Sequence, residues 1–240
     1  MKCALCLKPA DLCKSHIIPE FCFHPFYDST HRFIEVTDVE RGKVRKGQQG
    51  YWERLLCKQC EAHISRFERH ARRLFVDPLP RLHPNTRTVR QHSRLRYDLL
   101  KLFLLSILWR SSVATNSFYK FVSLGRHEEI IRNMVLVNDP GPPNIYPSII
   151  YALQFEGSWL RDFMVEPTST KFEAHRCYRL VLAGFVVFTF VSSHSLPDKL
   201  LRHVMSPSRP IETYDKELAS LGFLREVWNR SAETTKDVEI

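Results

Sequence analysis

Two pairs of cysteines near the start of the chain have the residue type and spacing of metal ligands. Two residues separate the cysteines of each pair, and the four are Cys3, Cys6, Cys57 and Cys60. A structural Zn²⁺ ion takes four soft ligands in a tetrahedron, with each sulfur at about 2.3 Å, and a Cys-x-x-Cys turn directs two thiolates at one ion. The two pairs therefore predict one closed, structural Zn²⁺ site.

A histidine lies in the long segment between the two pairs, within the string Ser15-His16-Ile17-Ile18-Pro19. Because imidazole exchanges a proton near neutral pH, His16 is a candidate general base. After the second pair, Glu61, Ser65 and Glu68 recur at the spacing of one helix face, and Mg²⁺ or Mn²⁺ prefers such oxygen ligands. The alternative is that both glutamates pair with neighbouring arginines on an exposed helix surface.

The positive charge of the chain is concentrated in one segment. The whole chain carries a net charge of +9, and the segment from Lys58 to Arg96 holds ten Lys or Arg residues against three acidic ones. A basic segment beside a metal module is the electrostatic pattern of a polyanion-binding protein, since each neutralised phosphate releases counterions. The candidate phosphate contacts are Arg87, Arg90, Arg94 and Arg96. A solvated helix face and linker would carry the same charges without binding a partner.

The composition and the first residues favour a globular protein that is neither secreted nor embedded in a membrane. Hydrophobic residues make up 44% of the 240, which is enough for a buried core. The first residues are metal-ligand sequence rather than an apolar signal region, so we expect a cytoplasmic protein whose seven cysteines are thiols or ligands. The longest apolar run, 180–191, is shorter than the roughly 20 residues that a membrane-spanning helix needs. We expect no membrane segment.

The hydrophobic pattern divides the chain into an N-terminal and a C-terminal part. Residues 1–77 form the first unit, in which apolar residues at helical spacing predict a helix from the second cysteine pair to about Phe75. Prolines end this helix, and 78–96 is expected to be a basic linker or arm. Residues 97–230 form a second domain, and 231–240 are expected to be a flexible tail.

The second domain is expected to mix helices and strands. An apolar stripe from Leu99 to Leu108 predicts a helix that ends near Arg110. The remaining predicted elements are strands over 149–155 and 178–192 and helices over 127–134, 197–205 and 214–229. The predicted fold class is therefore α+β.

The cysteine pairs, the His-Ile-Ile-Pro string and the helix start together resemble the HNH family of endonucleases. The resemblance rests on Ser15-His16-Ile17-Ile18-Pro19 and Leu56-Cys57-Lys58-Gln59-Cys60-Glu61, and it is confined to the first third of the chain. It implies a zinc-stapled ββα-metal or treble-clef module followed by a mixed α/β C-terminal domain. It also implies His16 as the base, with Glu61 and Glu68 at a catalytic Mg²⁺ or Mn²⁺ ion. Ser15 and Trp52 stand where the family has Asp and Asn.

The resemblance implies a metal-dependent endonuclease that hydrolyses DNA phosphodiester bonds, of mobile-element or host-defence type. The two departures from the family pattern favour an alternative, a catalytically inactive zinc module that binds nucleic acid or a protein partner. Nucleic acid, in the first instance DNA, is the expected partner under the favoured reading. The C-terminal domain is a candidate binding region for a protein partner. Alternatively, it is itself a sensor that controls the first unit.

Overall fold

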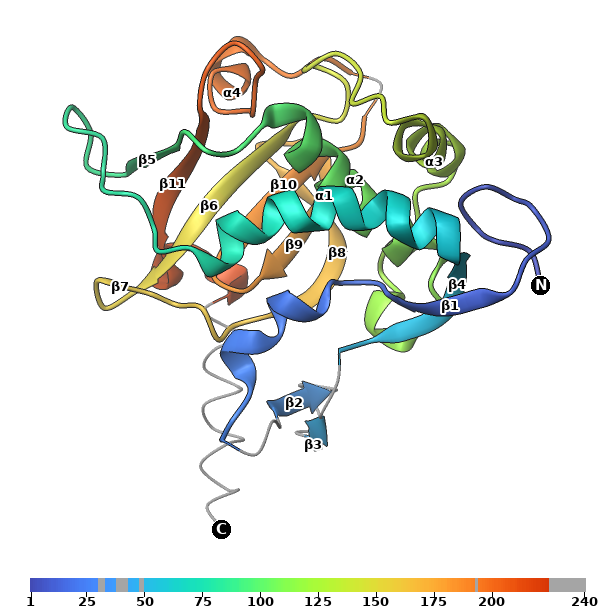
Figure 1. Cartoon of the computed structure of the whole chain (residues 1–240). Helices are drawn as coiled ribbons and strands as arrows, with labels where there is room; N and C mark the ends of the chain where they lie inside the picture. The colour runs from blue at the N-terminus through green and yellow to red at the C-terminus, as the bar shows by residue number, and fades with distance from the viewer. Residues whose placement is uncertain (30–32, 38–42, 48–49, 193, 225–240) are drawn as a thin grey trace.

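The computed structural model describes residues 1–29, 33–37, 43–47, 50–192 and 194–224, and Figure 1 shows it as a ribbon. The chain forms a mixed α/β fold with a cluster of four cysteines near its N-terminus. Its elements, in chain order, are β1 (Leu12–His16), the 3₁₀ helices η1 (Glu20–Cys22) and η2 (His24–Phe26), β2 (Phe33–Thr37), β3 (Lys43–Gly47), β4 (Trp52–Cys57), α1 (Lys58–Val76), β5 (Val89–His92), α2 (Tyr97–Val113), η3 (Ser117–Tyr119), α3 (His127–Val137), β6 (Ser148–Phe155), β7 (Ser158–Trp159), β8 (Val165–Phe172), β9 (His175–Leu182), β10 (Phe185–Phe190), α4 (Asp198–Leu201), β11 (Ile211–Glu217) and η4 (Leu218–Ser220).

The N-terminal part is a strand pair joined directly to a long helix. Strands β1 and β4 are antiparallel, and their register places His16 opposite Trp52. Strand β4 continues into α1 without a loop, because Cys57 ends the strand and is also the N-cap residue of the helix. A second antiparallel pair, β2 with β3, lies within the long connection between β1 and β4. This arrangement positions the end of β1 beside the first turns of α1.

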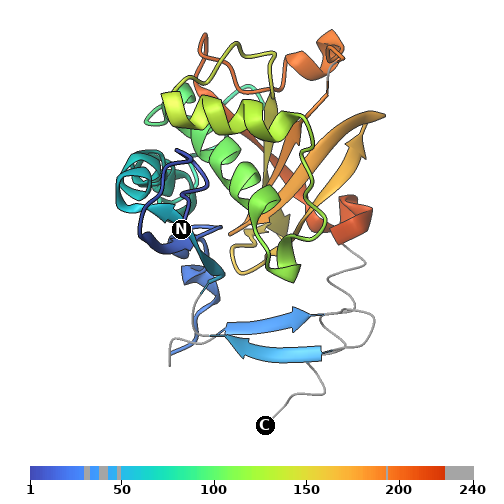
Figure 2. The same ribbon diagram turned by 90° about the vertical axis from the view of Figure 1, so that its right-hand side faces the viewer.

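The C-terminal part is built on a seven-stranded sheet with the strand order β5-β11-β6-β10-β9-β8, with β7 paired to β6. Neighbouring strands are antiparallel except β11 and β6, which are parallel. Figures 1 and 2 show α1 and α2 on the same side of this sheet. Because side chains alternate along a strand, Phe185 and Val187 of β10 join the core beneath these helices, while Val186 and Phe188 join a second core on the other face.

One buried cluster joins the N-terminal and C-terminal parts of the chain. The ring of Phe75 in α1 lies 5.8 Å from that of Phe103 in α2 and 5.5 Å from that of Phe185 in β10. The same cluster contains the buried cysteines near the N-terminus. The division into domains at residue 77 stays a prediction, but apolar packing is continuous across it.

Local hydrophobic periodicity predicted the long helices well and the late elements of the chain poorly. The helices expected over the second cysteine pair and over Leu99–Leu108 are α1 and α2. The single strand expected over 178–192 is wrong, because it is a hairpin of β9 and β10 that turns at Gly184, whose φ is +86°. The helix expected from Tyr214 is also wrong, because β11 reaches Glu217 there.

Two further expectations concern the basic linker and the ends of the chain. Part of the segment 78–96 is strand β5, which forms the edge of the main sheet beside β11. The tail expected over 231–240 lies outside the described residues. Within the described ranges, no helix has the combination of length and hydropathy needed to cross a membrane.

Candidate functional site: a four-cysteine cluster and the cavity beside it

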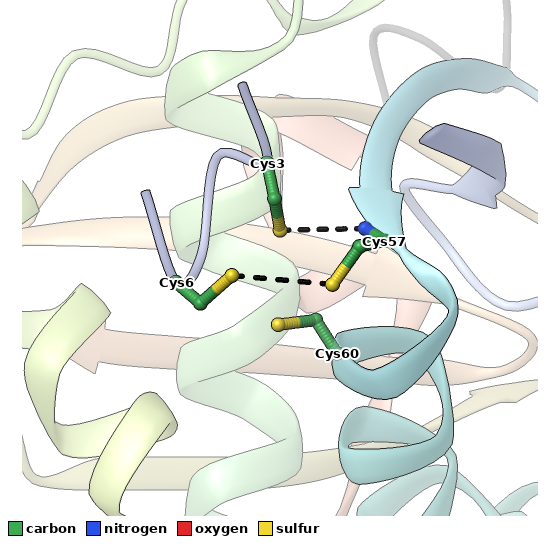
Figure 3. Close-up of side chains that lie close together, drawn as sticks. All are labelled: Cys3, Cys6, Cys57 and Cys60. Carbon is green, nitrogen blue, oxygen red and sulfur yellow. Dashed lines mark hydrogen bonds between the residues drawn. The ribbon is translucent and has the colours of Figure 1, made fainter. Parts of the chain in front are cut away.

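The four predicted metal ligands come together in space. The sulfur atoms of Cys3, Cys6, Cys57 and Cys60 all lie within 4.8 Å of one another, and Figure 3 shows them directed toward a common point. In the described part of the chain this is the only such group of three or more Cys, His, Asp or Glu side chains. Four thiols at this spacing can hold one metal ion.

The first cysteine pair lies in a tight turn that docks on β4. The N–H of Leu7 donates to the carbonyl of Cys3 at 2.9 Å, and the N–H of Cys3 donates to the carbonyl of Lys8 at 3.0 Å. Leu7 has a left-handed φ of 62°, which closes the turn. The N–H of Ala4 donates to the carbonyl of Leu55 at 3.0 Å, so the turn is attached to the strand that carries the second pair.

The second cysteine pair occupies the start of α1. Backbone N–H groups at a helix N-terminus have no partner within the helix and favour a nearby negative charge. The N–H of Cys57 donates to the sulfur of Cys3 at 3.3 Å, as Figure 3 shows. Burial raises the pKa of Cys3, but N–H donors of Cys6, Cys57 and Leu5 outweigh burial and lower it to about 7.

The same environment opposes four negative charges in the absence of a cation. Burial raises the pKa of Cys60, and the three neighbouring thiols raise it further. Cys3, Cys57 and Cys60 are buried and Cys6 is half-buried, so the cluster is largely shielded from water. A bound metal ion would remove the conflict by compensating all four thiolates. The donor set therefore fits a closed metal site.

A cavity of about 250 Å³ is lined by residues of β1, α1 and α2 and of the segment that contains η1. All three predicted catalytic residues, His16, Glu61 and Glu68, line it. Its other charged lining residues are Lys14, Glu20, Arg69, Arg72 and Arg110. The cavity therefore combines an imidazole and carboxylates with a basic rim.

Glu61 offers an unused carboxylate oxygen in this cavity. Its Oε1 atom is buried and has no hydrogen-bond partner among the described residues. Burial raises the pKa of Glu61, while the Ser15 hydroxyl and the charge of Arg110 act in the opposite direction. Ser15 is itself fully buried and accepts the N–H of Leu56 at 3.1 Å. A buried carboxylate oxygen without a donor is a ready ligand for a hard cation.

Glu68 is held by an arginine that the sequence pattern did not single out as functional. An Oε1 atom of Glu68 lies 2.9 Å from Nη1 of Arg110, which is 2% exposed. The same Nη1 donates to the carbonyl of His16 at 2.6 Å. Arg110 thus connects α2 to the end of β1. The available signal was a charged residue in the last turn of a largely apolar helix.

The positions where the HNH pattern has Asp and Asn supply no ligand to the cavity. Ser15 has the structural contacts given above. Trp52 is 38% exposed, and the ammonium of Lys14 lies 4.4 Å from its ring centroid. The neighbouring Glu53 accepts hydrogen bonds from the N–H groups of Thr115 and Asn116 at 2.8 and 2.9 Å. Glu53 therefore attaches β4 to the segment after α2.

The four predicted phosphate-binding arginines lie along and beside β5, and two of them are paired. Arg90 makes a bidentate ion pair with Asp215 at 2.7 and 2.6 Å. Arg96 makes one with Asp98 at 3.1 and 2.5 Å. Arg87 and Arg94 are exposed. Only the latter two are free of an ion pair within the described residues, so this segment presents less positive charge than its sequence indicates.

Helix α1 presents a second group of basic residues, which belong to the predicted basic segment but were not among the four arginines selected as phosphate contacts. Its exposed arginines are Arg66, Arg69, Arg72 and Arg73. Within the described residues none of them forms an ion pair with a carboxylate. Arg69 and Arg72 border the cavity that contains His16 and Glu61. Their helical spacing beyond Glu61 was visible in the sequence, but their relation to the cavity required the fold.

Comparisons with family models, with curated proteins and with solved structures each found no match. No family is therefore assigned by similarity. The function proposed below depends on the cysteine cluster and on the side chains of the cavity.

Proposed function

We propose that the protein is a metal-dependent endonuclease of the HNH type that hydrolyses DNA phosphodiester bonds. One observation carries the proposal: His16, Glu61 and Glu68, selected in the sequence for their chemistry, line a single cavity next to the four cysteines. The same cavity has a basic rim from Lys14, Arg69 and Arg72, as a phosphate-containing substrate requires.

In this proposal the four cysteines bind Zn²⁺ in a structural role. We assign the cysteine turn, the β1–β4 pair and α1 to a treble-clef module, and the position of one ligand pair in the turn and the other at the helix start supports this assignment. Four sulfur ligands leave no open coordination position, so this ion would hold the module together and take no part in hydrolysis. Free thiols as ligands also suit the reducing cytoplasm, where we place the protein.

The proposed chemistry assigns a separate task to each cavity side chain. His16 accepts a proton from the attacking water, because imidazole can be unprotonated at neutral pH. The free oxygen of Glu61 is the candidate ligand for Mg²⁺ or Mn²⁺, and such an ion would stabilise charge on the phosphate and the leaving oxygen. Glu68 neutralises Arg110, which in turn fixes the backbone of His16.

The test is cleavage of plasmid, single-stranded DNA and RNA by zinc-loaded protein with Mg²⁺ or Mn²⁺. We expect His16→Ala to lower the cleavage rate by roughly 10²-fold or more, since a positioned base contributes about 10² to 10⁴. His194→Ala, which removes an exposed histidine that does not line the cavity, is the matched control. Absence of cleavage by the wild-type protein on all three substrates, or equal rates for His16→Ala, would refute the nuclease assignment.

Two observations favour a second candidate function, a catalytically inactive zinc module that binds nucleic acid. Glu68 is already paired with Arg110, and the cavity holds no group of three closely spaced ligand side chains among the described residues. Such a module would bind DNA with a marked dependence on salt, yet leave it intact in the presence of Mg²⁺ or Mn²⁺. Binding without cleavage would therefore select this candidate.

A further inference from the structure

The imidazole of His16 contacts a carboxylate that has no role in the function proposed above. Its Nε2 atom lies 3.2 Å from Oε2 of Glu20, and both side chains are about one-third exposed, at 35% and 33%. Glu20 begins the short helix η1 directly after Pro19, whose φ of −57° turns the chain back toward β1. Residues 16 and 20 therefore face each other across one turn of chain.

Glu20 is itself held by two donors from other segments. The hydroxyl of Tyr27 donates to Oε1 of Glu20, and the N–H of Gly50 donates to Oε2 at 3.2 Å. Burial raises the pKa of Tyr27, and Glu20 raises it further, so the hydroxyl keeps its proton and remains a donor. Both carboxylate oxygens of Glu20 are thus occupied in a fixed orientation.

The Gly50 contact requires glycine at that position. A Cβ atom there would lie 2.5 Å from the ring of Phe23, which is closer than side-chain carbons approach. Phe23 is buried, so its ring cannot move aside without opening the core. The absence of a side chain at Gly50 lets its N–H reach Glu20.

His16 is also fixed through its backbone. Its carbonyl accepts the Nη1 proton of Arg110 at 2.6 Å, and its strand pairs with β4 in register with Trp52. The contacts of the backbone with Arg110 and of the ring with Glu20 together restrict the orientation of the imidazole. A neutral imidazole carries its proton on one nitrogen only, and a carboxylate partner selects the nitrogen that faces it.

We propose that Glu20 is a positioning residue that holds the His16 imidazole with its proton on Nε2 and leaves Nδ1 as the nitrogen that accepts a proton from water. The catalytic role of Glu20 rests on the proposed nuclease function, whereas the contact between Glu20 and His16 does not depend on it. Glu20 acts through His16, because its two oxygens are used by the imidazole, the tyrosine and the backbone donor. Its carboxylate also stabilises the imidazolium that forms when His16 takes a proton.

The direct test is nitrogen NMR of the zinc-loaded full chain labelled with ¹⁵N-histidine, at a pH where its imidazoles are neutral. The His16 signals are identified by their loss in His16→Gln. We expect the two ring nitrogens of wild-type His16 to show the full separation of a single Nε2–H tautomer. In Glu20→Ala the separation should fall toward that of free histidine, and Tyr27→Phe should cause a smaller change in the same direction.

Cleavage kinetics provide the second readout. Glu20→Ala should lower kcat at least about 10-fold with little change in KM, because an orienting carboxylate affects proton transfer rather than binding. Glu217→Ala, an exposed glutamate at the end of β11, is the control. If the Glu20→Ala protein does not retain zinc, the nearly isosteric Glu20→Gln variant replaces it in the NMR measurement. We expect Glu20→Gln to have an intermediate effect, because its amide retains one acceptor oxygen.

The outcomes separate this inference from the nuclease assignment. A wild-type Nδ1–H tautomer, or unchanged nitrogen shifts in both Glu20 variants, would overturn the positioning role even if the protein cleaves DNA. The expected shifts in a protein that cleaves no substrate would keep the contact and its tautomer while removing the nuclease function. Expected shifts together with unchanged kcat would show that the contact does not serve catalysis.

Discussion

At the scale of single residues, the site is defined by which polar atoms are already occupied. Glu68 is neutralised by Arg110, and Glu20 is saturated by its donors and His16. Glu61 alone of the three presents a buried oxygen with no partner among the described residues. Since leaving such a group unpaired costs about 1–3 kcal/mol, Glu61 is the carboxylate whose environment most favours a bound cation.

Glu61→Gln should therefore separate metal binding from folding. We expect the cleavage rate at low Mn²⁺ concentration to fall at least roughly 10-fold, because loss of a residue that only supports a metal ligand already has an effect of that size. A high Mn²⁺ concentration should restore part of the rate. The thermal midpoint without Mn²⁺ should change little, because the substitution removes a buried charge whose Oε1 atom has no hydrogen-bond partner among the described residues and keeps an acceptor for the Ser15 hydroxyl. The measurements are cleavage rate against Mn²⁺ concentration and thermal unfolding.

Glu217→Gln, an exposed carboxylate outside the cavity, is the control for Glu61→Gln. An unchanged Mn²⁺ dependence in Glu61→Gln would exclude this carboxylate as the cation ligand. A fall in the thermal midpoint would instead show that the charged form of Glu61 stabilises the fold through Ser15 and Arg110.

At the scale of elements, α1 contributes residues to both the cysteine cluster and the cavity. Its first turn carries Cys60, its inner face packs Phe67 and Phe75 into the core, and its outer face carries four exposed arginines. Strand β5 differs, because Arg90 is used to bind β11 through Asp215. If the protein binds nucleic acid as proposed, we expect α1, more than β5, to contact the phosphates.

Replacing Arg69 and Arg72 with Ala should weaken DNA binding to unrelated sequences by similar factors. The slope of log K against log salt should become shallower by about one to two units, since each phosphate contact contributes about 0.9. Arg87→Ala with Arg94→Ala removes the same charge from the β5 region and is the matched control. Binding is measured over a salt series without Mg²⁺ or Mn²⁺, so that cleavage does not interfere. A larger change in the control pair would locate the interface at β5.

At the scale of the whole molecule, the N-terminal site depends on the C-terminal part. Arg110 reaches from α2 to His16, Glu53 of β4 binds the segment after α2, and the buried cysteines belong to the same apolar cluster as β10. The site is consequently shared between two segments that the sequence assigns to different domains. We therefore expect loss of a metal bound by the cysteines to destabilise the whole core.

Zinc removal should lower the stability of the full chain. We expect one zinc per chain by elemental analysis and a large fall in the thermal midpoint with a strong chelator. The binding free energy of structural Zn²⁺ is typically ~10–16 kcal/mol. A loss of only ~4 kcal/mol of this from the free energy of unfolding would lower the thermal midpoint by roughly 8–16 °C. Cys60→Ser should have the same effect, whereas Cys13→Ser, which lies outside the cluster, should not. Well under one zinc per chain, or folding unaffected by the chelator, would disprove a structural zinc.

The sequence by itself determined the features that depend on local spacing. The two Cys-x-x-Cys pairs predicted the cluster, because a turn of that length brings both sulfurs of a pair together. Apolar periodicity predicted α1 and α2, because the side chains of one helix face recur within a few residues. The shared helix face of Glu61 and Glu68 follows from the same rule.

Only the tertiary structure decided the features that depend on distant partners. The pairing of β11 with β6, the ion pair of Arg90 with Asp215, and the contact of Arg110 with His16 join residues far apart in the chain. Each depends on how apolar faces pack, and no local pattern encodes which charged groups that packing brings together. For this reason the arginines chosen from charge density include two that are already paired, Arg90 and Arg96. Glu20 and Arg110 emerged only from the fold.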